Sequence, residues 1–105
     1  MSGFGEMGNL LKQAQEMQRQ LDQVRAELRQ RTVEGLAAGG AVRIELTADR
    51  HEVRAVRLGP GAPADPRALE ESLTAALRDA LRRATDTERE SIGRITGGLN
   101  LPGLL

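Results

Sequence analysis

The chain has 105 residues, and its 15 basic and 15 acidic side chains give a formal net charge of zero at pH 7. It contains no cysteine, tryptophan or tyrosine and a single phenylalanine. This composition predicts one domain with an aliphatic core, excludes disulfide bonds and thiolate metal sites, and argues against single-strand nucleic-acid binding, which uses aromatic side chains to stack bases.

The first predicted element is a long helix over residues 7–31, preceded by a flexible, glycine-containing lead-in over residues 1–8. Apolar side chains recur on this helix at alternating spacings of three and four residues, namely Met7, Leu10, Ala14, Met17, Leu21, Val24 and Leu28. This is the heptad spacing of a coiled coil. A helix of this length spans roughly 37 Å, more than the later elements of so short a chain can cover. We therefore expect a second copy to cover part of the stripe, the alternative being that it packs on the chain's own sheet.

Residues 32–58 predict a three-stranded antiparallel sheet. The clearest strand covers residues 42–47, where Val42, Ile44 and Leu46 alternate with polar side chains and so indicate one buried face. Shorter patterns over 32–36 and 52–58 predict the strands before and after it, joined by turns at 39–40 and 49–50. A sheet of three strands has two open edges, and these favour pairing with another subunit.

A second helix is predicted to begin at Asp65 and Pro66, which suit a helix cap and first turn, after a connector rich in glycine and proline. One face carries a broad apolar stripe suited to packing on the sheet, consisting of Leu69, Leu73, Ala76, Leu77, Ala80, Leu81 and Ala84. Residues 97–105 predict an irregular tail whose leucines dock in part on the body. The predicted fold is therefore α+β: helix, three-stranded antiparallel sheet, helix and extended tail.

Four stretches in this order carry a resemblance to a known family: residues 8–18 (GNLLKQAQEMQ), 42–44 (VRI), 79–83 (DALRR) and 98–103 (GLNLPG). Together they resemble the YbaB/EbfC family of bacterial nucleoid-associated proteins over nearly the whole chain. The resemblance implies a single domain and a homodimer in which helices project from a joined sheet like tweezers. It also implies binding to double-stranded DNA with little sequence preference, and a role at the nucleoid in chromosome organisation or gene regulation.

Basic side chains on the helices would then bridge DNA phosphates, giving an affinity that falls with salt. The candidate DNA-binding residues are Lys12, Arg19, Arg82, Arg83 and Arg89, ranked ahead of Arg43 and Arg54 on the sheet. In the resemblance, Arg82 and Arg83 fall where the family places a basic pair, and Lys12 and Arg43 match basic positions.

For each candidate the alternative is an ion pair on the same helix or a solvated cation. Arg83 has Asp79 and Asp86 within reach along the helix, and Arg82 has Asp86. Such exposed pairs contribute little to stability.

The zero net charge supports a second hypothesis, a structural or protein-interaction dimer that does not bind DNA significantly. Its partner would contact the first helix, which holds all six glutamines of the chain, or the leucine-containing tail. An enzyme is not expected, because His51 is the only histidine and no metal-ligand spacing, phosphate-binding loop or nucleophile motif occurs. We likewise expect no cofactor, no small-molecule substrate and no membrane partner. No run of about 18 apolar residues or signal segment is present, so a cytoplasmic location is expected.

Overall fold

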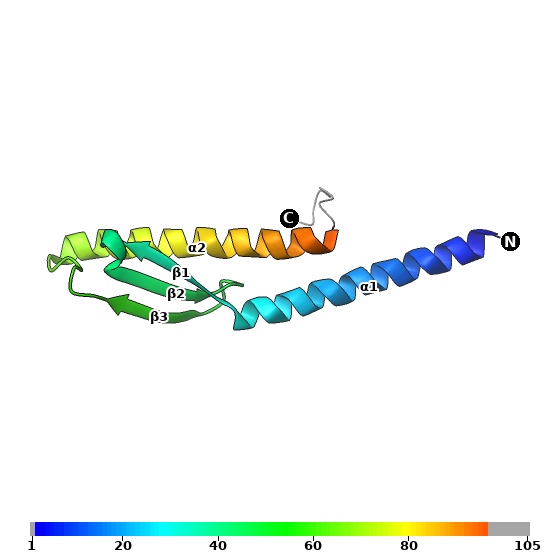
Figure 1. Cartoon of the computed structure of the whole chain (residues 1–105), viewed down its shortest axis with the longest axis horizontal. Helices are drawn as coiled ribbons and strands as arrows, with labels where there is room; N and C mark the ends of the chain where they lie inside the picture. The colour runs from blue at the N-terminus through cyan, green and yellow to red at the C-terminus, as the bar shows by residue number, and fades with distance from the viewer. Residues whose placement is uncertain (1, 97–105) are drawn as a thin grey trace.

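The computed structural model describes residues 2–96 and confirms the predicted order of helix, three antiparallel strands and helix (Figure 1). The elements are α1 (Ser2–Gln30), β1 (Thr32–Ala37), a short 3-10 turn η1 (Ala38–Gly40), β2 (Val42–Thr47), β3 (Val53–Leu58) and α2 (Pro66–Thr96). The molecule is elongated, with extents of 74 × 22 × 16 Å. The predicted irregular tail at 97–105, and its docking on the body, lie outside the described residues. In the described part of the chain, neither helix is apolar enough over a sufficient length to cross a membrane.

The first helix starts earlier than predicted. α1 begins at Ser2, so the prediction of an irregular lead-in is wrong for residues 2–8, which are helical. The prediction relied on the glycines there, but each glycine costs a helix only about 1 kcal/mol relative to alanine. No proline follows to break the backbone hydrogen bonds, and the helix therefore continues through Gly5 and Gly8.

The sheet has the order β1-β2-β3 and is covered on one face by α2 (Figure 1). The inward side chains of β2 form the core with two alanines of α2: Val42, Ile44, Leu46, Ala76 and Ala80. The period-two pattern of the second strand thus predicted its three buried apolar side chains correctly. It was wrong for Thr47, which was expected on the polar face and is buried. α2 lies over β1 and β2 and makes few contacts with β3, so the inner face of the third strand is left uncovered.

β1 and α2 approach each other most closely at Gly35. A Cβ atom placed on Gly35 would lie 2.1 Å from the carbonyl oxygen of Ala76 and 2.4 Å from the backbone nitrogen of Ala80. Ala76 and Ala80 are themselves completely buried. The small side chains on both elements therefore allow the backbones to touch, which fixes the position of α2 on the sheet.

The start of α2 agrees with the prediction from Asp65 and Pro66. The Asp65 carboxylate accepts a hydrogen bond from the backbone N–H of Ala68 at 3.0 Å, as an N-terminal cap does. At the other end the helix includes Ile92 and Ile95 and runs to Thr96. The broad apolar stripe is covered only in part, because Leu77 and Leu81 remain exposed beside the buried alanines.

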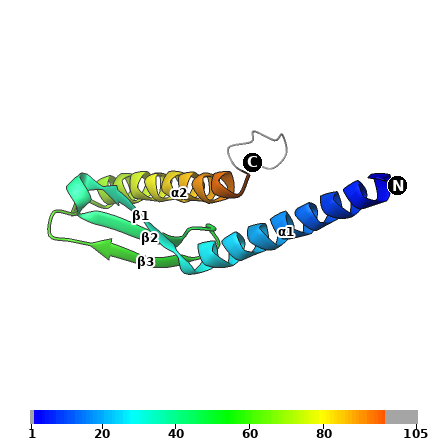
Figure 2. The ribbon, with the colours of Figure 1, turned by 45° about the vertical axis from the view of Figure 1, so that its right-hand side comes forward.

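α1 projects away from the sheet and from α2, as Figures 1 and 2 show from two directions. Leu21 and Leu28, in its second half, are buried against the rest of the chain. In the first half, Met7 and Leu10 are more than half exposed, at 61% and 65%. The chain's own body therefore covers only the C-terminal part of the heptad stripe, as its length suggested.

Candidate nucleic-acid interface

A group of arginines lies on α2 beside the edge strand β1. Arg78, Arg82 and Arg83 line one shallow surface hollow together with Asp79 of the same helix and Leu36 of β1. The side chains of Arg82 and Arg83 are 73% and 53% exposed. We call Arg78, Arg82 and Arg83 the arginine cluster.

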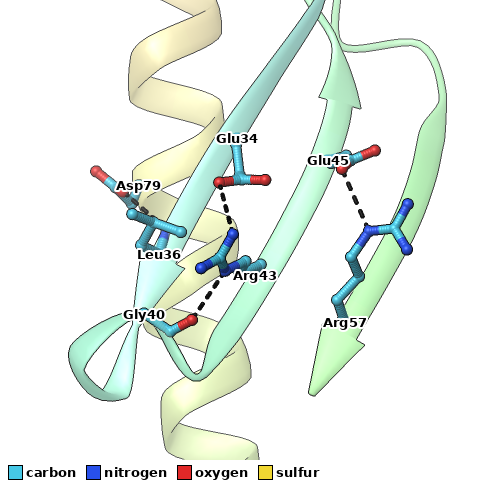
Figure 3. Close-up of polar contacts among 7 residues, drawn as sticks. All are labelled: Glu34, Leu36, Gly40, Arg43, Glu45, Arg57 and Asp79. Atoms are coloured by element: carbon cyan, nitrogen blue, oxygen red, sulfur yellow. Dashed lines mark hydrogen bonds and ion pairs between the residues drawn. The ribbon is translucent and has the colours of Figure 1, made fainter. Parts of the chain in front are cut away.

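Asp79 connects this cluster to the sheet. Its Oδ1 atom accepts a hydrogen bond from Nη2 of Arg82 at 2.7 Å, and its Oδ2 atom accepts one from Nε of Arg83 at 3.1 Å. The same Oδ2 also accepts a bond from the backbone N–H of Leu36 at 3.0 Å (Figure 3). The bond from Leu36, more than the two arginines, lowers the pKa of Asp79 against the opposing effect of burial. Asp79 is therefore a charged carboxylate at neutral pH.

The ion pairs expected for these arginines form only in part. Arg83 pairs with Asp79, one of its two expected partners, and Arg82 pairs with Asp79 in place of Asp86. In the described part of the chain, Asp86 forms no ion pair. The difference arises because the Leu36 N–H already holds the Asp79 carboxylate where both guanidinium groups can reach it.

The remaining predicted residues lie elsewhere. Lys12 and Arg19 are on α1, before its first buried side chain, Leu21, and Arg19 is paired with Glu16 through two hydrogen bonds. That pairing lowers the pKa of Glu16. Arg89 is exposed on α2, two turns beyond Arg82, and neither it nor Lys12 forms an ion pair with a described residue. The structure thus brings Arg82 and Arg83 together but separates them from the two candidates on α1.

The outer face of the sheet also carries arginines, but its charges are compensated (Figure 3). Nε of Arg43 donates to the carbonyl oxygen of Gly40 at 3.0 Å, and its Nη1 lies 3.9 Å from Oε1 of Glu34. Arg57 donates to Glu45 across the neighbouring strands at 3.3 Å. Arg54, on β3, is likewise 3.7 Å from Glu52. Each of these three cations faces a carboxylate of its own, whereas Arg82 and Arg83 share Asp79.

Arg78 was not among the predicted site residues. It lies four residues before Arg82, and side chains at this spacing share one side of a helix. The sequence signal was therefore the four-residue spacing of Arg78 and Arg82, which the prediction did not use.

The chemistry available here is anion binding. Guanidinium groups present several N–H donors and bind phosphate through two of them at once. Across residues 5–95, no three His, Cys, Asp or Glu side chains are grouped so as to hold a metal ion. His51 is exposed at the β2–β3 turn, where its backbone N–H donates to Asp49.

The chain is similar to known proteins along almost its full length. A nucleoid-associated protein of Acetivibrio thermocellus is 42% identical over 106 aligned positions, covering 97% of this chain and 93% of that protein. A nucleoid-associated protein of Pelotomaculum thermopropionicum is 38% identical, covering 95% and 96%. Among solved structures, an uncharacterized protein from Helicobacter pylori has the same fold, with a TM-score of 0.70 at 18% identity, covering 90% of this chain and 97% of that one.

The model of one protein family matches residues 3–99. This family is defined by DNA binding and is not a family of enzymes. The match includes all of α1 after Ser2, the whole sheet, and α2 with the arginine cluster. The chain therefore belongs to the YbaB/EbfC DNA-binding family.

Proposed function

We propose that this protein is a nucleoid-associated protein that binds double-stranded DNA as a homodimer with little sequence preference. In this role it organises the chromosome or regulates genes, at the nucleoid in the cytoplasm. The observation that carries the proposal is the arginine cluster on α2, in a chain that belongs to a DNA-binding family.

The cluster explains how a chain of zero net charge can bind a polyanion. The hollow is lined by three arginines and one carboxylate, Asp79, so its lining carries more positive than negative charge although the whole chain is neutral. Arginines that contact phosphates release the cations condensed on DNA, and the gain is larger at low salt. Contacts to the backbone carry no sequence information by themselves, which accounts for the weak sequence preference. A second copy of the chain doubles the number of contacts.

The homodimer is supported by the uncovered face of β3. In the register of β2 with β3, Leu58 lies opposite Val42 and Val56 lies opposite Ile44, so they share the face that α2 covers on the other strands. Yet Val53, Val56 and Leu58 are 56%, 53% and 52% exposed. Such a row of apolar side chains next to a core indicates an interaction surface.

The two edges of the sheet support the same arrangement. The outer N–H of Leu36 on β1 is occupied by Asp79, so that this edge is blocked by α2. β3 forms the other edge of the sheet and itself carries the exposed apolar row of Val53, Val56 and Leu58. A second copy that adds at β3 would extend the sheet and leave both α1 helices projecting, in the manner of tweezers. The uncovered half of the heptad stripe on α1 offers a further surface for the second copy, as in a coiled coil.

The alternative is a structural or protein-interaction dimer without significant DNA binding. It is favoured by the ion pairs that compensate Arg19, Arg43, Arg54 and Arg57. The two hypotheses make opposite predictions for a purified dimer mixed with DNA.

The test is the fluorescence anisotropy of a labelled, mixed-sequence duplex, titrated with the dimer at about 50 and 200 mM salt. We expect binding that weakens steeply between these concentrations. The double variant R82E/R83E is expected to bind at least about tenfold more weakly, because it replaces phosphate contacts by repulsion.

The matched control is R67E/R94E, which makes the same change in net charge at the two ends of α2. If R82E/R83E binds no more weakly than this control, while remaining a folded dimer, the arginine cluster is not the DNA site. If the unaltered dimer does not bind at 50 mM salt, the protein-interaction alternative replaces the present proposal.

A further inference from the structure

Asp79 lies among the arginines that we propose as the DNA site, although its charge opposes DNA binding. Its side chain is 15% exposed, far less than those of Arg82 and Arg83. It has the three hydrogen bonds described above, two from arginines of its own helix and one from the backbone of β1. A carboxylate that only formed ion pairs on the helix surface would not also accept a hydrogen bond from the backbone of β1.

We propose that Asp79 is a positioning residue for DNA binding, which holds Arg82 and Arg83 side by side at the edge of β1 so that both reach the phosphates of one DNA backbone. This inference rests on the proposed function and names a residue on which that function depends. Asp79 itself does not touch DNA; it acts through the two arginines.

The hydrogen-bond donors left over support this role. A guanidinium group has five N–H donors. Arg83 uses its Nε for Asp79, so both of its terminal nitrogens remain available to grip a phosphate at two points. Arg82 uses only Nη2 and keeps its Nη1 and Nε. Both side chains are thus held at one side while their exposed sides stay available for DNA.

The hydrogen bond from β1 to Asp79 fixes the carboxylate that holds Arg82 and Arg83. Its Oδ2 is fixed by the backbone N–H of Leu36, which belongs to a different element and moves little relative to α2, because β1 and α2 touch at Gly35. Asp86 is also acidic and within one helical turn of Arg82 and Arg83, but it has no such anchor and pairs with neither. The pKa of Asp79 is lowered, first by the Leu36 bond, so the carboxylate stays charged at neutral pH.

Two opposing effects decide whether Asp79 strengthens or weakens DNA binding. Immobilising a long side chain on binding weakens affinity by roughly 2- to 12-fold, and two arginines held in advance avoid part of this loss. The repulsion between the Asp79 carboxylate and a phosphate about 6 Å away weakens affinity by roughly threefold in bulk water and by roughly 100-fold at the effective dielectric constant near a protein surface. Two arginines ordered in advance recover up to the product of two ordering factors. The positioning role requires this gain to exceed the repulsion, and the affinity of D79N for DNA measures which effect is larger.

The experiment compares D79N with D86N in the anisotropy assay at one fixed salt concentration. D79N keeps the size of the side chain and an oxygen that accepts the Leu36 N–H, but loses the charge that holds the arginines. D86N removes the same charge two helical turns away. We expect D79N to bind about three- to tenfold more weakly than the unaltered protein, and D86N to bind equally or more tightly. Equal or tighter binding by D79N would overturn the inference.

A double-mutant cycle separates this role from a structural one. If Asp79 acts through the arginines, D79N causes no loss of DNA affinity when it is added to R82A/R83A, and the affinity rises because the repulsion between Asp79 and the phosphates is removed. An equal loss in both backgrounds would show that Asp79 supports only the fold, and would refute the positioning role.

A measurement on the unaltered protein does not depend on how the variants fold. Nitrogen-15 relaxation should show Arg83 Nε as rigid before DNA is added, and Arg89 Nε as mobile. Equal mobility at the two sites would overturn the inference. Absence of DNA binding by the unaltered dimer would instead overturn the proposed function, and the positioning role with it, so the two failures are distinguishable.

Discussion

Replacing Gly35 by alanine tests the contact that fixes α2 on the sheet. The added Cβ would lie 2.1, 2.4 and 2.7 Å from three atoms of Ala76 and Ala80. Two of these are backbone atoms of a helix, which cannot turn aside as a side chain does. The strand must therefore move away from α2 by about 1 Å, since ordinary contacts of a Cβ atom begin at about 3.4 Å.

The loss of stability in Gly35→Ala follows from the contacts between β1 and α2 that this movement loosens. Overpacking a core by a single group costs typically 1–3 kcal/mol when side chains can adjust. At Gly35 the neighbours are rigid, and the shift also loosens the buried contacts of Ala76, Ala80 and Ile44. We expect a loss of about 3–5 kcal/mol, a large part of the roughly 5–15 kcal/mol of a natural domain. For a domain of this size, that corresponds to a fall in Tm of roughly 12–40 °C.

Thermal unfolding followed by circular dichroism at 222 nm measures this fall. The matched control is Gly93→Ala in α2, where the added Cβ meets no atom within 4 Å. There the same change should raise stability by up to about 1 kcal/mol, because alanine favours a helix over glycine. A Tm for Gly35→Ala within about 3 °C of the unaltered protein would refute the close contact between β1 and α2.

Two further variants test the dimer surface and the hydrogen-bonded carboxylates Asp49 and Asp79. Val56→Asp puts a charge on the exposed apolar row of β3 and should yield a folded monomer in sedimentation velocity. Ala55→Lys, on the polar face of the same strand, is the control and should stay dimeric. A dimeric Val56→Asp would place the interface elsewhere. The pKa of Asp49 is lowered, mainly by its bond from the Thr47 hydroxyl, and that of Asp79 mainly by Leu36. The charged forms of Asp49 and Asp79 therefore stabilise the fold above about pH 4, and this stabilisation is lost as the pH falls below that value. Urea unfolding at pH 6 and pH 3 should show a smaller fall in the free energy of unfolding for D49N/D79N than for the unaltered protein. An equal loss in both proteins would contradict this.

The elements of the fold could be predicted because their signals are local. Alternation at Val42, Ile44 and Leu46 needs only the neighbouring residues, and so does the cap at Asp65. The early start of α1 was missed because glycine content was taken as a stop, although helix formation is cooperative along the chain.

The site depended on contacts that local patterns do not contain. Both Asp79 and Asp86 are spaced to pair with Arg83, and only the N–H of Leu36, distant in sequence, makes Asp79 the partner. The need for glycine at position 35 is equally invisible, since it depends on where α2 crosses β1. That Lys12, Arg19, Arg82, Arg83 and Arg89 contact DNA stays a prediction.

The junction between α1 and the sheet determines how the projecting helix behaves mechanically. One residue, Arg31, joins Gln30 to Thr32; its N–H donates to the carbonyl oxygen of Glu27, and its own carbonyl oxygen accepts a bond from Ala48. α1 is thus fixed to the sheet at its C-terminal end and projects from there, over roughly 43 Å at 1.5 Å per residue. A tilt of one degree at the fixed end displaces the far end by about 0.75 Å at that length. In a symmetric pair, the distance between the two tips is therefore the dimension most sensitive to substitutions around Arg31 and Ala48.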